Sequence, residues 1–335
     1  MKSLYFAREN TIELWDVDEP SPGSGQVKIK TAYASICATD IHQVTQGVLG
    51  AAPPMPLGHE TSGTVVELGP GTEASGLAVG DLVTAFPVAV CGQCRSCRSG
   101  TPQYCVNALP FGGFSEYYVT GANTVYPLPA GADLRSFTLV EPTACAIRAM
   151  DLVPIRHGQT VAISGVGGIG AILLNAILLS GATEVTVIEP VEAKRAMALA
   201  MGAAHVLDPR TQDLAAEADR ITDGLGFDVV FEASGSPQAA APALDIVGRC
   251  GRVVYFAVYP PSFELPVNLY DLYAKEASIH TVFTNPDLFP RAINLIPRLA
   301  LDTIIGPTVP LSNALEGVEL FHSGQHPKII LDCTR

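Results

Sequence analysis

The stretch TVAISGVGGIG, residues 160–170, decides the fold of this 335-residue chain. A short apolar run, Thr160–Ser164, leads into glycines spaced G-x-G-x-x-G, and an apolar helical pattern follows over 168–179. Glycines at this spacing let the backbone approach a pyrophosphate, whose negative charge the N-terminus of the following helix stabilises. The stretch therefore predicts a dinucleotide site, formed by Gly165, Gly167, Gly168, Ile169 and Gly170.

Strand and helix patterns alternate on both sides of these glycines. Strands are expected at 160–164, 185–189, 227–232 and 252–257, and helices at 168–179, 192–201 and 238–247. The strands are continuously apolar, which is typical of a parallel sheet covered by helices on both faces. We therefore predict an α/β fold with a doubly wound parallel sheet over 142–283. A glycine-rich turn in some other α/β protein is the alternative, and the register of strand, helix and a later acid disfavours it.

That acid is Glu189, nineteen residues after Gly170 and at the end of the next strand. A carboxylate there can accept both hydroxyls of an adenosine ribose and would repel a 2′-phosphate. Pro190 and Val191 follow, where a site for NADP normally has an arginine. The sequence therefore predicts NAD. Lys194 and Arg195, expected on the solvent face of the next helix, leave NADP open.

The first 141 residues have a different sequence pattern. Short β-rich runs separated by Pro and Gly predict a compact, antiparallel, barrel-like domain. An Ala-rich helix over 144–152 is expected to bridge the two domains. We assign the tail, 284–335, back to the first domain, with helices at 288–299 and 312–323 and a strand at 328–331.

Length and charge narrow the class of protein. A chain of 335 residues exceeds the size of most single cores, which favours two domains. The net charge of −13 argues against nucleic acid or an anionic membrane as partner. No apolar run reaches the length of a membrane span, and none resembles a signal peptide. We expect a cytoplasmic protein.

Four of the eight cysteines crowd into residues 91–105. Their spacing is C-x2-C-x2-C-x7-C, made by Cys91, Cys94, Cys97 and Cys105. Four thiolates so close together predict a closed tetrahedral zinc with a structural role. An iron–sulfur cluster is the alternative metal, although the spacing differs from common ferredoxin patterns.

A second group of metal-binding residue types surrounds the sequence PLGHETSG, residues 56–63. His59 and Glu60 are adjacent there and offer an imidazole nitrogen and a carboxylate. Because a zinc site needs about four donors, we expect Cys37 and Glu141 to complete it. Glu60 either ligates directly or lies behind the ligands, and Glu141 acts directly or through a water. Each residue alone could be an ordinary core group, but the combination favours a catalytic zinc.

The chain resembles the zinc-containing medium-chain dehydrogenases over nearly its whole length. The resemblance rests on Cys37 with Thr39 and His42, on Gly58 to Gly63, on the four cysteines, on Glu141-Pro142 and on the glycine turn at Gly165. It is closest to the sorbitol or polyol branch, in which Glu-Pro replaces a second cysteine ligand. Threonine and butanediol dehydrogenases share the four-cysteine lobe, so the resemblance does not select one substrate.

The resemblance implies a GroES-like β-rich catalytic domain joined to a Rossmann domain, with two Zn²⁺ per chain and NAD. It implies hydride transfer between NAD and a secondary alcohol or polyol, giving the ketone reversibly. Thr39 would take the hydroxyl proton and hand it through the cofactor ribose to His42 at the surface. A homodimer or homotetramer is expected.

Other functions stay open at this point. One is a dehydrogenase of a phosphorylated, acidic or amino-substituted alcohol, to which Arg148, seven residues after Glu141, could contribute if it faces the substrate. Another is a zinc-independent reductase of the same superfamily, which needs none of the predicted ligands. A third is a non-enzymatic nucleotide sensor, since a fold alone does not define a function.

Overall fold

The computed structural model describes residues 1–182 and 184–335, which form two compact units. Unit 1 comprises Met1–Ala144, Thr284–Arg298 and Ile305–Arg335, and unit 2 comprises Cys145–Phe283 and Leu299–Ile304. Within the tail, Leu299–Ile304 belongs to unit 2 instead of the first domain, and the N–H of Ala300 donates to Asn175 Oδ1 at 3.2 Å. None of the helices in the described ranges is both long and apolar enough to cross a bilayer.

Unit 1 is built on a twisted sheet whose path runs β10-β6-β5-β3-β18-β17, with β9 also paired to β3. Its strands are β3 (Gln26–Ser35), β5 (Glu60–Leu68), β6 (Leu82–Ala85), β9 (Tyr117–Gly121), β10 (Val125–Pro127), β17 (Ile305–Pro310) and β18 (Lys328–Asp332). A smaller sheet joins β1 (Lys2–Arg8), β2 (Thr11–Asp16) and β4 (Met55–Pro56), and a third joins β7 (Val88–Ala89) and β8 (Leu109–Pro110). The strand pairs of unit 1 in the described ranges are antiparallel, as expected, except β17 with β18, which are parallel.

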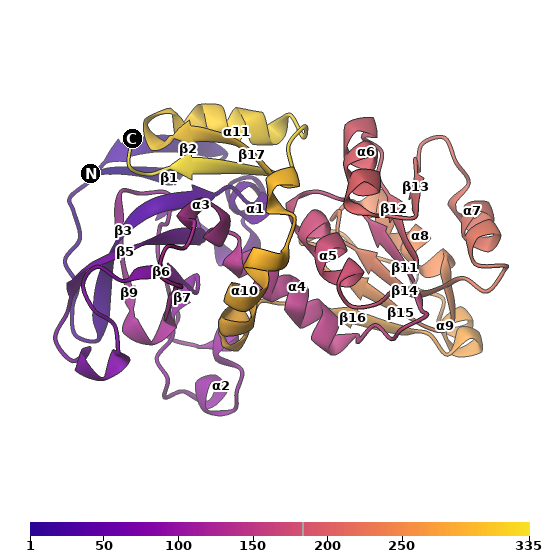
Figure 1. Ribbon diagram of the computed structural model, residues 1–335, viewed down its shortest axis with the longest axis horizontal. Coiled ribbons are helices and arrows are strands. Elements are labelled where there is room, and N and C mark those ends of the chain that lie inside the picture. Colours follow the sequence, from indigo (N-terminus) through magenta and orange to yellow (C-terminus); the bar gives the residue numbers. More distant parts are fainter. Residues whose placement is uncertain (183) are drawn as a thin grey trace. The chain divides into compact units, whose positions relative to one another are not determined.

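The helices of unit 1 are α1 (Ala38–Gln46), α2 (Arg95–Arg98), α3 (Leu134–Phe137), α10 (Phe289–Leu295) and α11 (Ala314–His322). Figure 1 shows α11, near the C-terminus, beside the N-terminal strand β2. The core between the N-terminal strands and the C-terminal segment contains Leu4, Leu57, Phe114, Ile329 and Leu331, all at most 1% exposed. Burial of these side chains from both ends of the chain fixes the tail on the N-terminal strands.

The pairing of β18 with β3 sets the position of Lys328. Ile330 pairs with Ser35 on β3, and Ser35 in turn pairs with Glu60 on β5. Lys328, two residues before Ile330, is thereby brought to the region where β5 begins.

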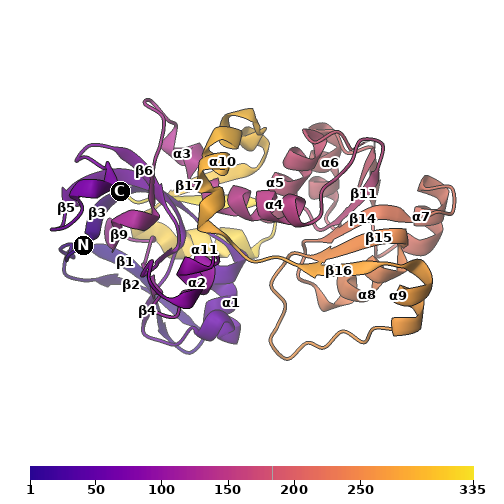
Figure 2. The ribbon, with the colours of Figure 1, turned by 90° about the horizontal axis from the view of Figure 1, so that it is seen from below.

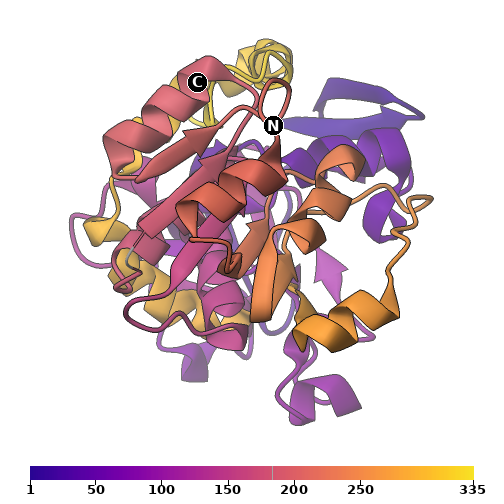
Figure 3. The same ribbon diagram turned by 90° about the vertical axis from the view of Figure 1, so that its right-hand side faces the viewer.

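Unit 2 contains a six-stranded parallel sheet in the order β13-β12-β11-β14-β15-β16, which confirms the predicted doubly wound fold. The strands are β11 (Thr160–Ser164), β12 (Glu184–Ile188), β13 (His205–Leu207), β14 (Phe227–Glu232), β15 (Val247–Tyr255) and β16 (Ser278–Thr281). The helices are α5 (Gly168–Leu178), α6 (Glu192–Met201), α7 (Leu214–Ile221), α8 (Pro237–Asp245) and α9 (Leu269–Lys275). Figures 2 and 3 show helices on both faces of this sheet, with α5 and α6 on one and α8 and α9 on the other.

The helix α4 (Val140–Leu152) begins four residues earlier than the sequence predicts. Glu141 and Pro142 therefore lie in its first turn, where a proline is tolerated because the N–H it lacks would have no helical partner. This start fixes the backbone at Glu141.

Candidate metal centres and cofactor site

Cys37, His59 and Glu60 come together in unit 1, each offering one ligand atom, and these atoms lie within 4.8 Å of one another. Cys37 is the N-cap of α1, just after β3, whereas His59 and Glu60 stand at the start of β5. Because β3 and β5 are paired, their ends place the thiol beside the imidazole and the carboxylate. We call these three residues the mixed-ligand site. Thiolate, imidazole and carboxylate are a donor set that suits zinc.

Asp40 holds three residues of this region, Cys37, Gly58 and His59, by hydrogen bonds. Its buried carboxylate lies 2.9 Å from His59 Nδ1 and accepts the N–H of Cys37 at 2.9 Å and of Gly58 at 3.2 Å. Burial lowers the pKa of His59, but the negative charges of Asp40 and Cys37 outweigh it and raise that pKa well above its usual value. With Nδ1 facing Asp40, Nε2 is the ring nitrogen left for a metal.

Glu60 forms a buried ion pair with Lys328, a residue that is not among the predicted site residues. The ammonium of Lys328 lies 2.5 Å from Oε1 and 2.6 Å from Oε2 of Glu60, and the two side chains are 4% and 1% exposed. Burial lowers the pKa of Lys328, yet the charges of Glu60 and Cys37 raise it overall. A lysine in the apolar run KIILD was the available signal, because a lysine is rarely buried without a counter-charge.

Glu141 does not join the mixed-ligand site among the described residues, so three of the four predicted ligands come together. It is 7% exposed in the first turn of α4, and Oε1 accepts a hydrogen bond from Thr284 Oγ1 at 3.1 Å. Its negative charge also contributes to the raised pKa of Lys328. Glu141 therefore lies close enough to Lys328 for their charges to interact.

Thr39 and His42 lie on α1, directly after Cys37, and both are half-buried. The sequence predicts His42 at the surface, but its Nδ1 is buried and has no hydrogen-bond partner in the described part of the chain. Burial lowers the pKa of His42, which keeps the ring neutral and able to accept a proton near pH 7.

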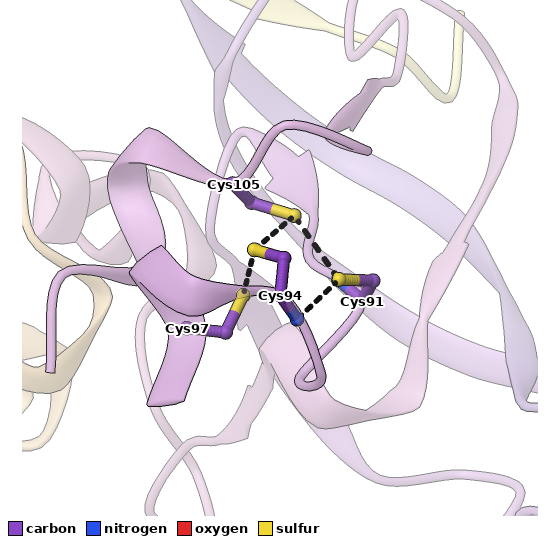
Figure 4. Close-up of side chains that lie close together, drawn as sticks. All are labelled: Cys91, Cys94, Cys97 and Cys105. Carbon is purple, nitrogen blue, oxygen red and sulfur yellow. Dashed lines mark hydrogen bonds between the residues drawn. The ribbon is translucent and has the colours of Figure 1, made fainter. Parts of the chain in front are cut away.

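The four cysteines 91, 94, 97 and 105 converge in the loop that carries α2, as predicted from their spacing (Figure 4). The sulfur of Cys94 lies 3.5 Å from that of Cys97 and 3.9 Å from that of Cys105, and Cys105 lies 3.5 Å from Cys91. Four thiolates about 2.3 Å from one tetrahedral zinc would be about 3.8 Å apart. The lobe therefore fits a closed structural zinc. Hydrogen bonds from the N–H groups of Gln93 and Cys94 lower the pKa of Cys91 to about 6.

The glycine turn after β11 has the shape of a pyrophosphate site. Gly165 has φ +87°, and a Cβ on Gly170 would lie 2.0 Å from the carbonyl oxygen of Gly165. A side chain on Gly167, the N-cap of α5, would instead meet no described atom within 4 Å. Two glycines thus allow the tight turn, and the third leaves room for a ligand at the helix N-terminus.

Glu189 follows β12 and is 4% exposed. Its Oε2 accepts the N–H of Val166 in the glycine turn at 3.0 Å, and its Oε1 accepts the N–H of Val191 at 2.9 Å. Each oxygen keeps a further lone pair for a ribose hydroxyl. The carboxylate therefore also shapes the glycine turn, a contact that the sequence did not reveal.

The sequence predicts Arg195 on the solvent face of α6, but in the structure the side chain is mostly buried. Its side chain is 17% exposed, and Nη1 donates to the carbonyl oxygens of Glu189 at 2.7 Å and Pro190 at 2.8 Å. The same nitrogen lies 3.2 Å from Asp208 Oδ2. A hydrogen bond from Arg210, supported by the charge of Arg195, lowers the pKa of Asp208. The guanidinium of Arg195 is thus held beside Glu189, the residue predicted to select NAD.

Known proteins with similar sequences share both units. Residues 23–130 match the family described as "Alcohol dehydrogenase GroES-like domain", and residues 168–298 match "Zinc-binding dehydrogenase". The L-threonine 3-dehydrogenase of Pyrococcus abyssi is 38% identical over 264 residues, which cover 76% of this chain and 75% of that protein. The sorbitol dehydrogenase of Halalkalibacterium halodurans is 32% identical over 288 residues, 83% of each chain.

A solved structure from Sinorhizobium meliloti, provisionally named a zinc-binding dehydrogenase and bound to NADP, has the same fold. It is 28% identical, has a TM-score of 0.89, and the match covers 99% of this chain and 98% of that one. The agreement extends over both units.

Proposed function

The chain belongs to the zinc-containing medium-chain dehydrogenases, and we propose that it transfers a hydride from a secondary alcohol or polyol to NAD, reversibly giving the ketone. The observation that carries this proposal is the mixed-ligand site, in which Cys37, His59 and Glu60 converge and Asp40 orients His59. A zinc-independent reductase would need no such group of donors.

Cys37, His59 and Glu60 would hold the catalytic zinc, with Glu141 acting nearby through a water, and Cys91, Cys94, Cys97 and Cys105 would hold the structural zinc. When bound at the mixed-ligand site, zinc supplies Lewis acidity that lowers the pKa of a hydroxyl, as it lowers that of water from about 15.7 to about 7. Lys328 neutralises Glu60 in the absence of metal, so the carboxylate is not left alone in an apolar interior.

Thr39 and His42 form the proton path in this proposal. Thr39 accepts the proton of the substrate hydroxyl as it gives up its own hydroxyl proton toward His42, and His42 releases a proton to solvent. The lowered pKa of His42 supports its part, because a neutral imidazole is needed to receive a proton.

The relatives support two classes of substrate. The sorbitol dehydrogenase supports a polyol. The L-threonine 3-dehydrogenase, with the higher identity, supports an amino-substituted secondary alcohol as the second candidate. Arg148 on α4 is half-buried and would favour an acidic or phosphorylated substrate only if it faces it.

For the cofactor we favour NAD over NADP. The carboxylate of Glu189 at the end of β12 supports NAD, because its charge would repel a 2′-phosphate. The NADP-bound relative and the position of Arg195 make NADP the alternative to test beside it.

We expect the protein to assemble as a homodimer or homotetramer. β16 is an edge strand of its sheet, and the adjacent α9 exposes Leu269, Tyr270 and Tyr273 to 75%, 73% and 83%. An unpaired edge beside exposed aromatic residues is a surface on which a second copy can pack.

A substrate panel tests the proposed function. Sorbitol and other polyols, simple secondary alcohols, L-threonine and polyol phosphates should each be offered with NAD and with NADP. Oxidation of a polyol or secondary alcohol with NAD supports the proposal. Oxidation of L-threonine alone would favour the second candidate, and turnover that persists without zinc would contradict the zinc mechanism.

A further inference from the structure

Glu232, the last residue of β14, is fully buried and has no part in the function proposed above. Its Oε1 accepts the N–H of Ser234 at 3.0 Å and also the hydroxyl of Ser234. Its Oε2 accepts the N–H of Gly235 at 3.2 Å and the hydroxyl of Tyr259. A buried carboxylate is strongly unfavourable unless donors surround it. Here these hydrogen-bond donors come from two separate segments of the chain.

The first segment is the turn after β14, and the second is the loop from β15 to α9, residues 256–268, visible as a long orange connection in Figures 2 and 3. Gly235 has φ +68°, and a Cβ there would lie 2.8 Å from the carbonyl oxygen of Val258. The ring of Tyr259 stacks on Phe263 with centroids 5.4 Å apart. The turn and the start of the loop are therefore in direct contact, with Glu232 hydrogen-bonded to both.

The turn also touches the glycine turn of the cofactor site. A Cβ on Gly165 would lie 2.7 Å from Cβ of Ser234. Numbered in chain order, the six strands of unit 2 run 3-2-1-4-5-6. In such a sheet the dinucleotide binds at the carboxyl ends of the strands, across the point where the order reverses, which here lies between β11 and β14.

The two halves of the cofactor can be assigned from this order. Glu189 follows β12 and marks the adenosine side of the reversal point. The carboxyl ends of β14 and β15 lie on the other side, where the nicotinamide half belongs. Glu232 and Tyr259 stand at those ends.

We propose that Glu232 and Tyr259 are positioning residues for the nicotinamide half of the cofactor, an inference that rests on the proposed function. The carboxylate of Glu232 accepts a hydrogen bond from the Tyr259 hydroxyl and so holds the start of the 256–268 loop against the turn at Ser234. The loop backbone is therefore fixed before the nicotinamide binds. Fixing a loop in its bound conformation removes part of the entropic cost of binding. Burial and the neighbouring Glu232 raise the pKa of Tyr259, so the phenol remains a donor at neutral pH.

The test compares two ligands on two matched variants. Tyr259→Phe removes only the hydroxyl bound to Glu232. Tyr255→Phe makes the same change in the same aromatic cluster, where the hydroxyl donates instead to the carbonyl oxygen of Ala240 at 2.7 Å. NADH carries the nicotinamide and ADP-ribose lacks it, so calorimetric titration of each zinc-loaded protein with both separates the two halves.

Tyr259→Phe should weaken the binding of NADH by about tenfold and leave the affinity for ADP-ribose unchanged. Tyr255→Phe should change neither affinity. Glu232→Gln, which keeps the shape but not the charge, should show the same selective loss as Tyr259→Phe. Equal weakening of both ligands would indicate a general structural role and overturn the inference, as would unchanged NADH affinity. Wild-type protein that binds neither ligand would overturn the proposed function itself.

Discussion

The ammonium nitrogen of Lys328 lies 2.5 and 2.6 Å from the two carboxylate oxygens of Glu60, although 268 residues separate them in the chain. Both side chains are buried, and Glu60 lies beside Cys37 and His59. The last strand of the protein thus supplies a counter-charge to a predicted zinc ligand near its start. A metal at this site and Lys328 would share the same carboxylate.

Replacing Lys328 by methionine should destabilise the fold. Once exchangeable zinc has been removed, Glu60 would remain as a buried, unpaired charge, and the free energy of unfolding should fall by about 3–5 kcal/mol. Adding Glu60→Gln to Lys328→Met should recover most of this loss, because the charge is then gone. Urea denaturation of the wild type and the variants gives the comparison. Equal stability of the single and double variants would mean that the pair carries no such coupling.

Asp40→Asn should weaken the binding of zinc at the mixed-ligand site by about 10–100-fold. The reason is that Asp40 fixes the ring of His59 and bonds the backbone at Cys37 and Gly58. Competition with a chromogenic chelator measures this affinity. The four-cysteine lobe is an internal control and should keep its zinc, and an unchanged affinity at the mixed-ligand site would contradict the orienting role.

Cys94→Ser should affect stability or subunit assembly more than chemistry. Cys94 lies between Cys97 and Cys105 in the lobe, so its loss opens a closed site without touching Cys37 or His59. The melting temperature and the zinc content should fall, and turnover per folded molecule should be retained. Loss of all turnover in a folded and normally assembled variant would show that the lobe is not merely structural.

The preference for NAD over NADP should be at least about a hundredfold in kcat/KM, or about 2.7 kcal/mol. Glu189→Ala should reduce this preference, mainly by weakening the binding of NAD, because the side chain also accepts the N–H of Val166 in the glycine turn. Arg195→Ala is the matched variant, and it should reduce the use of NADP if this cation meets the phosphate. Equal efficiency of the wild type with both cofactors would show that Glu189 does not face the ribose.

Features encoded by local spacing could be predicted from the sequence. The glycine turn, the strands at 160–164 and 227–232, the helix at 192–201 and the four-cysteine lobe are contained in short windows, and the structure places them as expected. Cys37, His59 and Glu60 were also brought together as predicted, because paired strands carry them.

Other features depend on register and packing between distant segments, which a single sequence does not reveal. Lys328 reaches Glu60 only because β18 pairs with β3 in one register. Glu141 lies outside the group of three, in the first turn of α4, which starts at Val140. Arg195 turns back to carbonyl oxygens and Asp208, a choice of side-chain direction that helical periodicity alone does not determine.

The central claim is a catalytic zinc held by Cys37, His59 and Glu60, and the most direct test measures zinc content and turnover together. The wild type should contain two zinc ions per chain. Cys37→Ala and His59→Ala should each contain one, retain NAD binding in unit 2, and lose nearly all turnover. Full turnover in either variant, or in wild-type protein whose exchangeable zinc has been removed, would contradict the account.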